Sequence, residues 1–481
     1  MLDKNTKKFS SARGKPDNRD SCQDRHMNRF LQWLREPVDG ASLAVFRIAF
    51  GAILLWDVFR YWPRIQRLYL DALGNPGGGF QFKYYGWGWV QALPDNSMYA
   101  LFVIIGLVSV AIMLGVFYKT ACIIFLIAFS WQFLIDQANY LNHFYLVILY
   151  GVCLLMVPAD RVWSLRRAKR SDWIPRWSLL GVMMMTEIVL VYAGLVKLNS
   201  DWLNGWPLKF WFSSRAEDHP VIGTLLADPD FAIASAWFST ALHLLGAPLL
   251  FVKKARLIIF CFYALFHVCN AVIFSIGIFP WMTLCATTLF FAPNWPRRWL
   301  RVVTAGTQPG PRPQRIESPW DKPVMTLFGI FMTYSILMPI RPLAYPGPAA
   351  WTEEGHRFSW RMKLRDKEAR AEFRVLDPDT GRRWRVNPHV WLTQRQARKM
   401  AVRPDMILQF AHHLDKVWQE KHRVPNPVVT ARVMCSLNYR KLAALMDSER
   451  DLSAIPRSLK PADWILPLDP SLKPGHYLQI Q

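Results

Sequence analysis

Long apolar runs alternate with polar and basic segments along the chain up to about residue 341. A run of about twenty apolar residues can cross a lipid bilayer as a helix. Nine runs are candidates, at 42–60, 97–117, 119–137, 143–158, 177–198, 233–252, 255–275, 278–292 and 323–341. Two of them, 143–158 and 278–292, are short for a span. The pattern predicts a multispan α-helical membrane protein with about nine spans.

The pattern changes over residues 342–481, which are polar and rich in proline and arginine. Apolar and polar residues alternate, as on a strand, at Phe358 to Leu364, Phe373 to Val375 and Trp384 to Val386. The turn sequence LDPDTG separates the last two. A helical pattern follows Pro404, and residues 428–437 favour another strand. We therefore predict a C-terminal extramembrane domain of the α+β class.

The charge of the chain predicts its orientation. Its net charge is +23, and the basic segments between the apolar runs are 1–36, 159–176, 253–256 and 293–322. With nine spans, all four lie on one side of the membrane, which the positive-inside rule makes cytoplasmic. We predict a disordered, basic cytoplasmic tail at 1–36, a transmembrane domain at 37–341 and an outer-face domain at 342–481. In a bacterial inner membrane, the outer face is periplasmic.

Composition and motifs exclude several classes of protein. With 52% hydrophobic and 19% charged residues, the chain is too apolar for an ordinary soluble protein and too charged for a purely transmembrane one. Its basic residues alternate with spans, so nucleic acid is not an expected partner. The seven cysteines form no CxxC pair or Cys/His zinc spacing. Walker A, GxGxxG, HExxH and GxSxG sequences are also absent. Any chemistry must come from a substrate or lipid cofactor with its own reactivity.

Lys197 stands near the end of the apolar run 177–198, among apolar neighbours. One interpretation is snorkelling, in which the ammonium group reaches the lipid headgroups. The other is a desolvated amine whose pKa is lowered until it acts as a base. Its position alone leaves both open.

Other polar residues occur in the apolar runs, where they are costly. The nine-span arrangement places His143, His267 and Asn270 near the same boundary as Lys197. Each histidine taken singly could be a satisfied helix–helix hydrogen bond, but their convergence favours a site. His243 and Glu187 are expected to lie deeper or on the wrong side, and we assign them structural roles.

Seven segments together resemble the vitamin K-dependent gamma-glutamyl carboxylase family, including its bacterial members. They are EPVDGASLAVFRIAFG (36–51), YLNHFYLVILYG (140–151), YAGLVKLNSDW (192–202), FHVCNAVIFSIGIFPW (266–281), HRFSWRMKLRD (356–366), NPHVWLTQRQARKM (387–400) and CSLNYRKLAALMD (435–447). They occur in the family's order, and the resemblance spans nearly the whole chain after the N-terminal tail. The resemblance implies that reduced vitamin K reacts with O2 to give its 2,3-epoxide. The strong base formed removes a γ-proton from protein glutamate, and CO2 is added.

The resemblance also implies roles for individual residues. Lys197 falls on the family's catalytic lysine, and His143 and His267 fall on its active-site histidines. Asn142, Asn270, Trp360 and Met362 are expected to contact the quinone, and Trp360, Arg365 and Arg398 the glutamate substrate. For Trp360 and Met362 the alternative is a strand that simply packs on the membrane domain. Arg361, Lys363, Arg365 and Arg398 could attract an acidic peptide or form a solvated basic face.

Three hypotheses follow from the sequence. The first is a membrane carboxylase that uses reduced vitamin K, O2 and CO2, with no metal or biotin. The second is a hydroquinone epoxidase without carboxylation. The third is a non-enzymatic membrane module that binds quinone or lipid, or a transporter, although the internal repeats of a transporter are not found. The expected partners are membrane lipid, an isoprenoid hydroquinone and a glutamate-containing protein or peptide.

Overall fold

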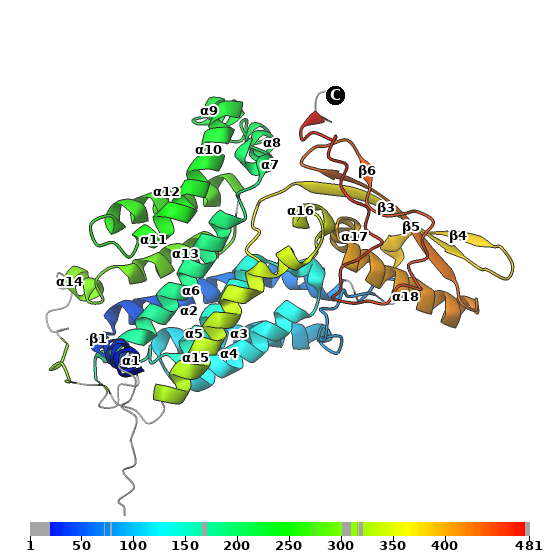
Figure 1. Ribbon diagram of the computed structural model, residues 1–481. Helices are drawn as coiled ribbons and strands as arrows, with labels where there is room; N and C mark the ends of the chain where they lie inside the picture. Colours follow the sequence, from blue (N-terminus) through cyan, green and yellow to red (C-terminus); the bar gives the residue numbers. More distant parts are fainter. Residues whose placement is uncertain are drawn as a thin grey trace, which may run out of the picture.

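The computed structural model describes residues 20–71, 73–76, 79–165, 171–274, 276–300, 309–314, 316 and 321–476. A bundle of helices forms one part, and a region of strands and helices lies beside one end of it (Figure 1). Of the predicted disordered tail 1–36, residues 1–19 lie outside the described residues, but Asp20–Leu34 is helix α1. The helix contacts the bundle through Trp33, because the Arg176 guanidinium lies 4.9 Å from the centre of the Trp33 ring. A composition-based prediction of disorder does not include this contact.

Six described helical segments are long and apolar enough to cross a membrane. They contain α2 (Ala41–Tyr61), α3 (Asp95–Leu114), α6 (Arg176–Leu195), α10 (Pro229–Ala241) continued by the π-helical turn η4 (Leu242–Gly246) and α11 (Ala247–Leu249), α12 (Arg256–Phe274), and α15 (Asp321–Leu337). Three predicted runs form shorter apolar helices, namely α4 (Tyr118–Leu134), α5 (Asn142–Met156) and α13 (Phe279–Thr287). The chain is a helical membrane protein, but a count of nine spans is not confirmed.

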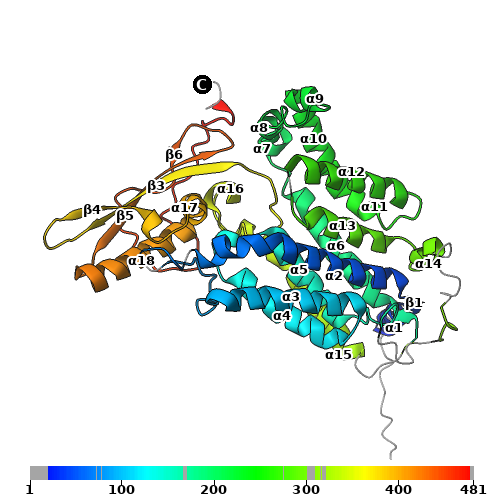
Figure 2. The ribbon, with the colours of Figure 1, turned by 180° about the vertical axis from the view of Figure 1, so that it is seen from behind.

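Small residues and outward apolar side chains explain how these helices are arranged. A Cβ at Gly51 of α2 would lie 2.5 Å from the backbone oxygen of Ser109 in α3, so glycine allows the close approach. Figure 2 shows α2, α3 and α4 running side by side. On α12, Leu257 and Ile258 are 62% and 60% exposed, as expected of side chains that face lipid.

Gly115 ends α3 in the left-handed region, at a φ of 69°. A Cβ there would lie 2.1 Å from Nη1 of the buried Arg47 and 2.4 Å from Oγ of Ser164. We expect Gly115→Ala to lower the free energy of unfolding by about 2–4 kcal/mol, from left-handed strain and overpacking together. The unfolding midpoint in detergent, followed by tryptophan fluorescence, checks this. Gly381 has a φ of 72° and open space around it, so Gly381→Ala is the matched control. Equal shifts for the two variants would contradict the steric explanation.

The C-terminal region contains an antiparallel sheet in the order β4-β3-β5-β6. Its strands are β3 (Lys367–Leu376), β4 (Arg383–Val386), β5 (Val428–Leu437) and β6 (Ala443–Ala444), and its main helices are α17 (Gln394–Ala401) and α18 (Pro404–His422). These elements confirm the predicted strands at 373–375, 384–386 and 428–437 and the helix after Pro404. The predicted turn is also present, with the Gly381 N–H donating to the Asp377 carbonyl over 2.9 Å.

The predicted strand from Phe358 to Leu364 is wrong, because this segment is an irregular loop. Phe358, Trp360 and Lys363 have φ values of 64°, 56° and 49°, in the left-handed region. Each such residue costs about 1–3 kcal/mol and persists only where the surroundings impose it. Docking of the aromatic side chains among the membrane helices supplies that constraint, and alternation along the sequence does not reveal it. We call residues 358–366 the docking loop.

Shorter elements complete the fold. β1 (Pro37–Asp39) pairs with β2 (Trp173–Pro175). The helices α7 (Ser200–Leu203), α8 (Leu208–Ser213) and α9 (Gly223–Ala227) follow α6, and α14 (Trp295–Leu300), η6 (Met338–Ala344) and α16 (Ala349–Thr352) come later. Figure 1 shows α1, β1 and α14 at one end of the bundle and the sheet beside the opposite end. The six cysteines whose side chains are described are free.

Candidate functional site

Lys197 lies two residues beyond the end of α6, in the turn that leads into α7. Its N–H donates to the Gly194 carbonyl over 3.0 Å. The side chain folds back onto α6, where Nζ donates to the Ala193 carbonyl over 2.6 Å, and the residue is only 5% exposed. Nζ also lies 5.6 Å from the centre of the Trp202 ring. Among the described residues no carboxylate pairs with it. The amine is therefore enclosed by protein and does not reach outward as a snorkelling lysine would.

Two buried histidines lie within electrostatic range of Lys197. His267, on α12, is 1% exposed, and its Nε2 has no hydrogen-bond partner among the described residues. His243, on η4, is 4% exposed, and its Nδ1 is 2.6 Å from the Ser239 carbonyl oxygen. A Cβ at Gly194 would lie 3.0 Å from the His243 Cβ, so this glycine lets the imidazole approach α6. We call Lys197, His243 and His267 the lysine cluster.

His143 belongs to a second group. Its Nε2 is buried with no hydrogen-bond partner among the described residues, and it lies within electrostatic range of Arg60, which pairs with Asp57 over 2.6 Å. The Arg60 guanidinium packs on Gly277, where a Cβ would be 2.2 Å from Nη1. The next aromatic residue, Phe279, has its ring 5.9 Å from that of His267. The turn before α13 therefore contacts both groups, at Arg60 and at His267, and no described hydrogen bond joins the two groups directly.

The docking loop meets the helical bundle at the start of α5. The Tyr140 hydroxyl accepts the Phe358 N–H over 2.8 Å and donates to Oδ1 of Asn142 over 2.8 Å. The Trp360 ring stacks on Tyr145, with the ring centres 5.2 Å apart, and is 1% exposed. Its Nε1 is buried without a partner in the described chain. Asn142 and Trp360, both predicted site residues, therefore lie on one surface near His143.

No described hydrogen bond joins Met362 or Asn270 to the other predicted site residues. Met362 is partly buried and packs against the main apolar cluster of the helical bundle. Asn270, on α12, uses its amide donor to bond the Phe266 carbonyl over 2.7 Å, which leaves its side-chain oxygen available. Asn270 is one helical turn from His267, and the described hydrogen bond of its side chain stays within α12.

Arg365 is already paired within the protein. It forms an ion pair with Glu353, and Nζ of Lys367 lies 3.7 Å from the same carboxylate. Burial would raise the pKa of Glu353, but Arg365, His356 and Lys367 lower it to about 2. Glu353 is therefore ionised and fixes Arg365, which limits direct contact between Arg365 and a substrate.

Other cations near the docking loop form no ion pair with any described carboxylate. Arg361, Lys399 and Arg403 form no ion pair among the described residues, and the Arg361 Nε is buried without a hydrogen bond. Burial and the neighbouring Arg403 lower the pKa of Lys399 to about 8. Arg398, predicted from the sequence, is exposed on α17 beside Lys399. This surplus of positive charge forms a site suited to an anion.

Two family models match the chain. Residues 35–295 match the HTTM domain, and residues 320–471 match the lumenal domain of the vitamin K-dependent gamma-carboxylase. The chain belongs to the vitamin K-dependent gamma-carboxylase family. No solved structure matches the chain significantly. The resemblance seen in the sequence motifs is thus confirmed, and the HTTM match agrees with a multi-pass membrane protein. The carboxylase-family membership implies dependence on vitamin K.

The residues at this carboxylase-family site fit a ligand with polar oxygens. Buried polar atoms are normally hydrogen-bonded, yet His143 Nε2, His267 Nε2 and Trp360 Nε1 have no partner in the described chain. They come from α5, α12 and the docking loop, which belong to both matched segments. Reduced vitamin K has hydroxyl groups that can pair with such atoms and an apolar body suited to the surrounding aromatic rings.

Two residues that lie beside the candidate site were not predicted as part of it. His243 is predicted to have a structural role because it is expected to lie deeper or on the wrong side. The structure places it in the π-helical turn η4, within electrostatic range of Lys197. Tyr140 was not singled out, although it is part of the quoted motif YLNHF. Its pairing with the backbone of Phe358, 218 residues away, has no local signal in the sequence.

Proposed function

We propose that the protein is an integral-membrane vitamin K-dependent carboxylase of glutamate residues in a protein or peptide. The observation that carries this proposal is the lysine cluster. A buried amine that pairs with no carboxylate among the described residues lies within electrostatic range of two buried imidazoles. A neutral amine in such a place can accept a proton, and burial without a counter-charge favours the neutral form.

Reduced vitamin K would supply the oxidisable hydroquinone, which O2 converts to the 2,3-epoxide with formation of the base that removes the glutamate γ-proton before CO2 addition. Lys197 accepts the hydroxyl proton. His267 and His143, whose Nε2 atoms have no hydrogen-bond partner in the described part of the chain, stabilise the oxygen that becomes negative. Asn142 and Asn270 orient the ring, and Trp360 and Met362 line the site and exclude water, which would otherwise quench a strong base.

The glutamate substrate is proposed to bind at the unpaired cations beside the docking loop. Its carboxylates would pair with Arg361, Lys399 and Arg403, which form no ion pair among the described residues. Arg398 is exposed and would attract an acidic peptide at longer range. Arg365 forms an ion pair with Glu353. We therefore propose that Arg365 orients the docking loop next to Trp360.

The proposed topology follows from the distribution of charge. The basic segments 1–36 and 293–322 contain α1 and α14, respectively. These two helices lie at the end of the bundle opposite the sheet (Figure 1). We propose a cytoplasmic N-terminal tail, a transmembrane domain at 37–341 and an outer domain at 342–481, periplasmic if the membrane is the inner membrane of a bacterium. Lys197 would then lie near the outer face.

The proposal is tested with purified protein in nanodiscs, given reduced vitamin K, O2, labelled CO2 and a glutamate-rich peptide. Epoxide together with label in the peptide is the expected result. Epoxide without label for a set of acidic peptides would favour the epoxidase alternative. Neither product, from folded protein that still binds the quinone, would contradict both enzymatic functions and favour a quinone-binding membrane module.

The pKa of Lys399 gives a pH prediction for peptide binding. Only the protonated amine pairs with a carboxylate, and the pKa of about 8 means that this form is lost above pH 8. We expect KM for the peptide to rise by up to about tenfold per pH unit above pH 8. Lys399→Arg should abolish this rise, because a guanidinium stays protonated in this range. A KM rise of the same size in both proteins would contradict the assignment.

A further inference from the structure

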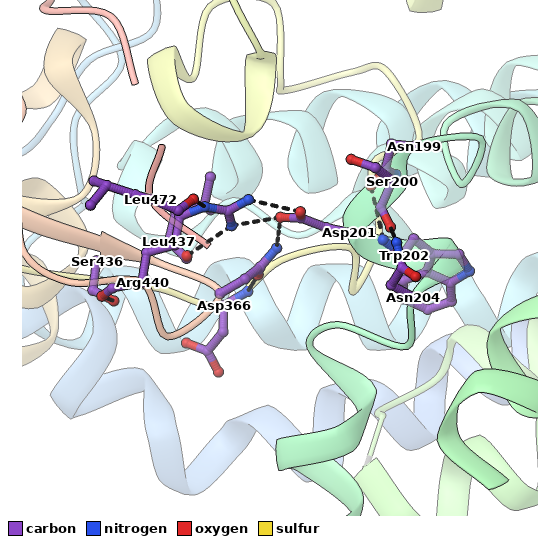
Figure 3. A network of polar contacts seen from close by, with 11 residues as sticks. Asn199, Ser200, Asp201, Trp202, Asn204, Asp366, Ser436, Leu437, Arg440 and Leu472 are labelled. Atoms are coloured by element: carbon purple, nitrogen blue, oxygen red, sulfur yellow. Dashed lines mark hydrogen bonds and ion pairs between the residues drawn. The ribbon is translucent and has the colours of Figure 1, made fainter. Parts of the chain in front are cut away.

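The turn that holds Lys197 is tied to the outer region by a buried ionic network (Figure 3). Asp201, on α7, receives two hydrogen bonds from Arg440, from Nη1 to Oδ2 over 2.7 Å and from Nη2 to Oδ1 over 2.8 Å. Asn438 donates a third bond to Oδ2 over 2.7 Å. The two charged side chains are 17% and 10% exposed. A bidentate pair of this kind fixes the orientation of both partners as well as their distance.

The same network reaches the docking loop. Oδ1 of Asn438 accepts the Asp366 N–H over 2.9 Å, and the Asn438 N–H donates to the Asp366 carbonyl over 2.7 Å. The Asp366 carboxylate accepts a hydrogen bond from Trp211 of α8 over 2.6 Å and one from the Tyr439 hydroxyl over 2.7 Å. Asn438 and Tyr439 have φ values of 51° and 61°, so the turn is held in a strained shape that presents both side chains.

The two segments joined in this way hold different parts of the proposed chemistry. Asp201 is four residues after Lys197, and the intervening Asn199 caps α7 by accepting the Trp202 N–H over 3.0 Å. Asp366 ends the loop that contains Trp360 and Arg365. We propose that Asp201 and Arg440 are positioning residues that hold the Lys197 turn and the docking loop in one fixed relation. This inference rests on the proposed function and concerns how epoxidation of the hydroquinone is coupled to carboxylation of glutamate.

The physical reason is the need for alignment between two sites. Epoxidation requires the Lys197 amine beside the hydroquinone, and carboxylation also requires the glutamate γ-carbon beside the base that results. A misplacement of about 1 Å can reduce a rate by roughly a hundredfold. Disturbing the network should therefore reduce carboxylation more than epoxidation, because carboxylation also requires alignment of the glutamate, which is proposed to bind beside the docking loop.

The test compares Arg440→Lys and Asp201→Asn with Arg385→Lys. Arg385 pairs with Glu372 over 3.2 Å, with side chains 76% and 44% exposed, and serves as the matched control. Lysine keeps the charge but cannot make the bidentate contact. We expect the ratio of CO2 fixed to epoxide formed to fall about tenfold in the two network variants and to stay unchanged in the control. Should a network variant fail to fold, Tyr439→Phe removes only the hydroxyl bond to Asp366 and keeps the ring, which lies 4.1 Å from Phe210.

Hydrogen exchange of residues 196–204 and 358–366 gives a readout that does not need activity. We expect faster exchange in both segments for Arg440→Lys and in neither for Arg385→Lys. Unchanged exchange would overturn the inference, and so would faster exchange with a wild-type product ratio. A wild-type protein that forms no epoxide would refute the proposed function, while the exchange result would still decide whether the network ties the two segments.

Discussion

Replacing Lys197 with alanine is expected to reduce epoxide formation by about 10²–10⁴-fold, the range that a general base contributes. The alanine variant should still insert and bind the quinone, because Nζ forms its hydrogen bond with its own helix, to the Ala193 carbonyl, and supports no ion pair among the described residues. Epoxide is measured by chromatography, and quinone binding by quenching of tryptophan fluorescence. Lys209→Ala is the control, since Lys209 lies on α8, against the Trp206 ring.

Lys197→Arg separates the two interpretations of this lysine. A guanidinium keeps the positive charge and can reach outward, but it does not lose its proton near neutral pH. If residue 197 must accept a proton, the arginine variant should be as inactive as the alanine variant. Wild-type turnover by Lys197→Arg would show that charge or snorkelling is all that the position requires.

His267→Leu is expected to lower the rate of epoxidation by about 10²–10³-fold, the effect of removing one donor to a developing oxyanion. His267 is buried, and its Nε2 is available for a ligand because no described residue bonds to it. His267→Gln should recover part of the rate, because the amide supplies a donor in a similar place. The rate of a single turnover with saturating hydroquinone measures both variants.

The exposed His389 provides the control for this prediction, as His389→Gln should leave the rate unchanged. If His267→Leu binds the quinone and turns over at the wild-type rate, His267 is a packing residue. If leucine and glutamine variants are equally slow with correct folding, the position requires an imidazole, and the role of a simple hydrogen-bond donor is wrong.

Hydrophobic pattern predicted the elements that depend on local sequence. The apolar runs gave the positions of α2, α3, α6 and α12, because a helix in lipid must be apolar along its length. Alternation gave β3, β4 and β5, because one face of the sheet packs on α18. Lys197 could be singled out because a lone charge in an apolar run is costly.

Features imposed by distant contacts could not be predicted in this way. The docking loop alternates like a strand, but its left-handed residues are held by Tyr140 and Tyr145, more than two hundred residues earlier. His243 depends on a π-helical turn that has no signature in hydrophobicity. Arg365 looked free in the sequence, and only the fold brings Glu353 onto it. The number of spans is also not confirmed, since the apolar helices α4, α5 and α13 are shorter than the six candidate spans.

The most direct test of the central claim is cleavage of the glutamate γ-C–H bond. A peptide with tritium at the γ-carbon is incubated with the wild-type protein, reduced vitamin K and O2, and tritium released to water is counted. Release that requires both the quinone and Lys197 is the predicted result. Epoxide formation without any release of tritium, for peptides that bind the protein, would contradict the proposal that this protein is a carboxylase.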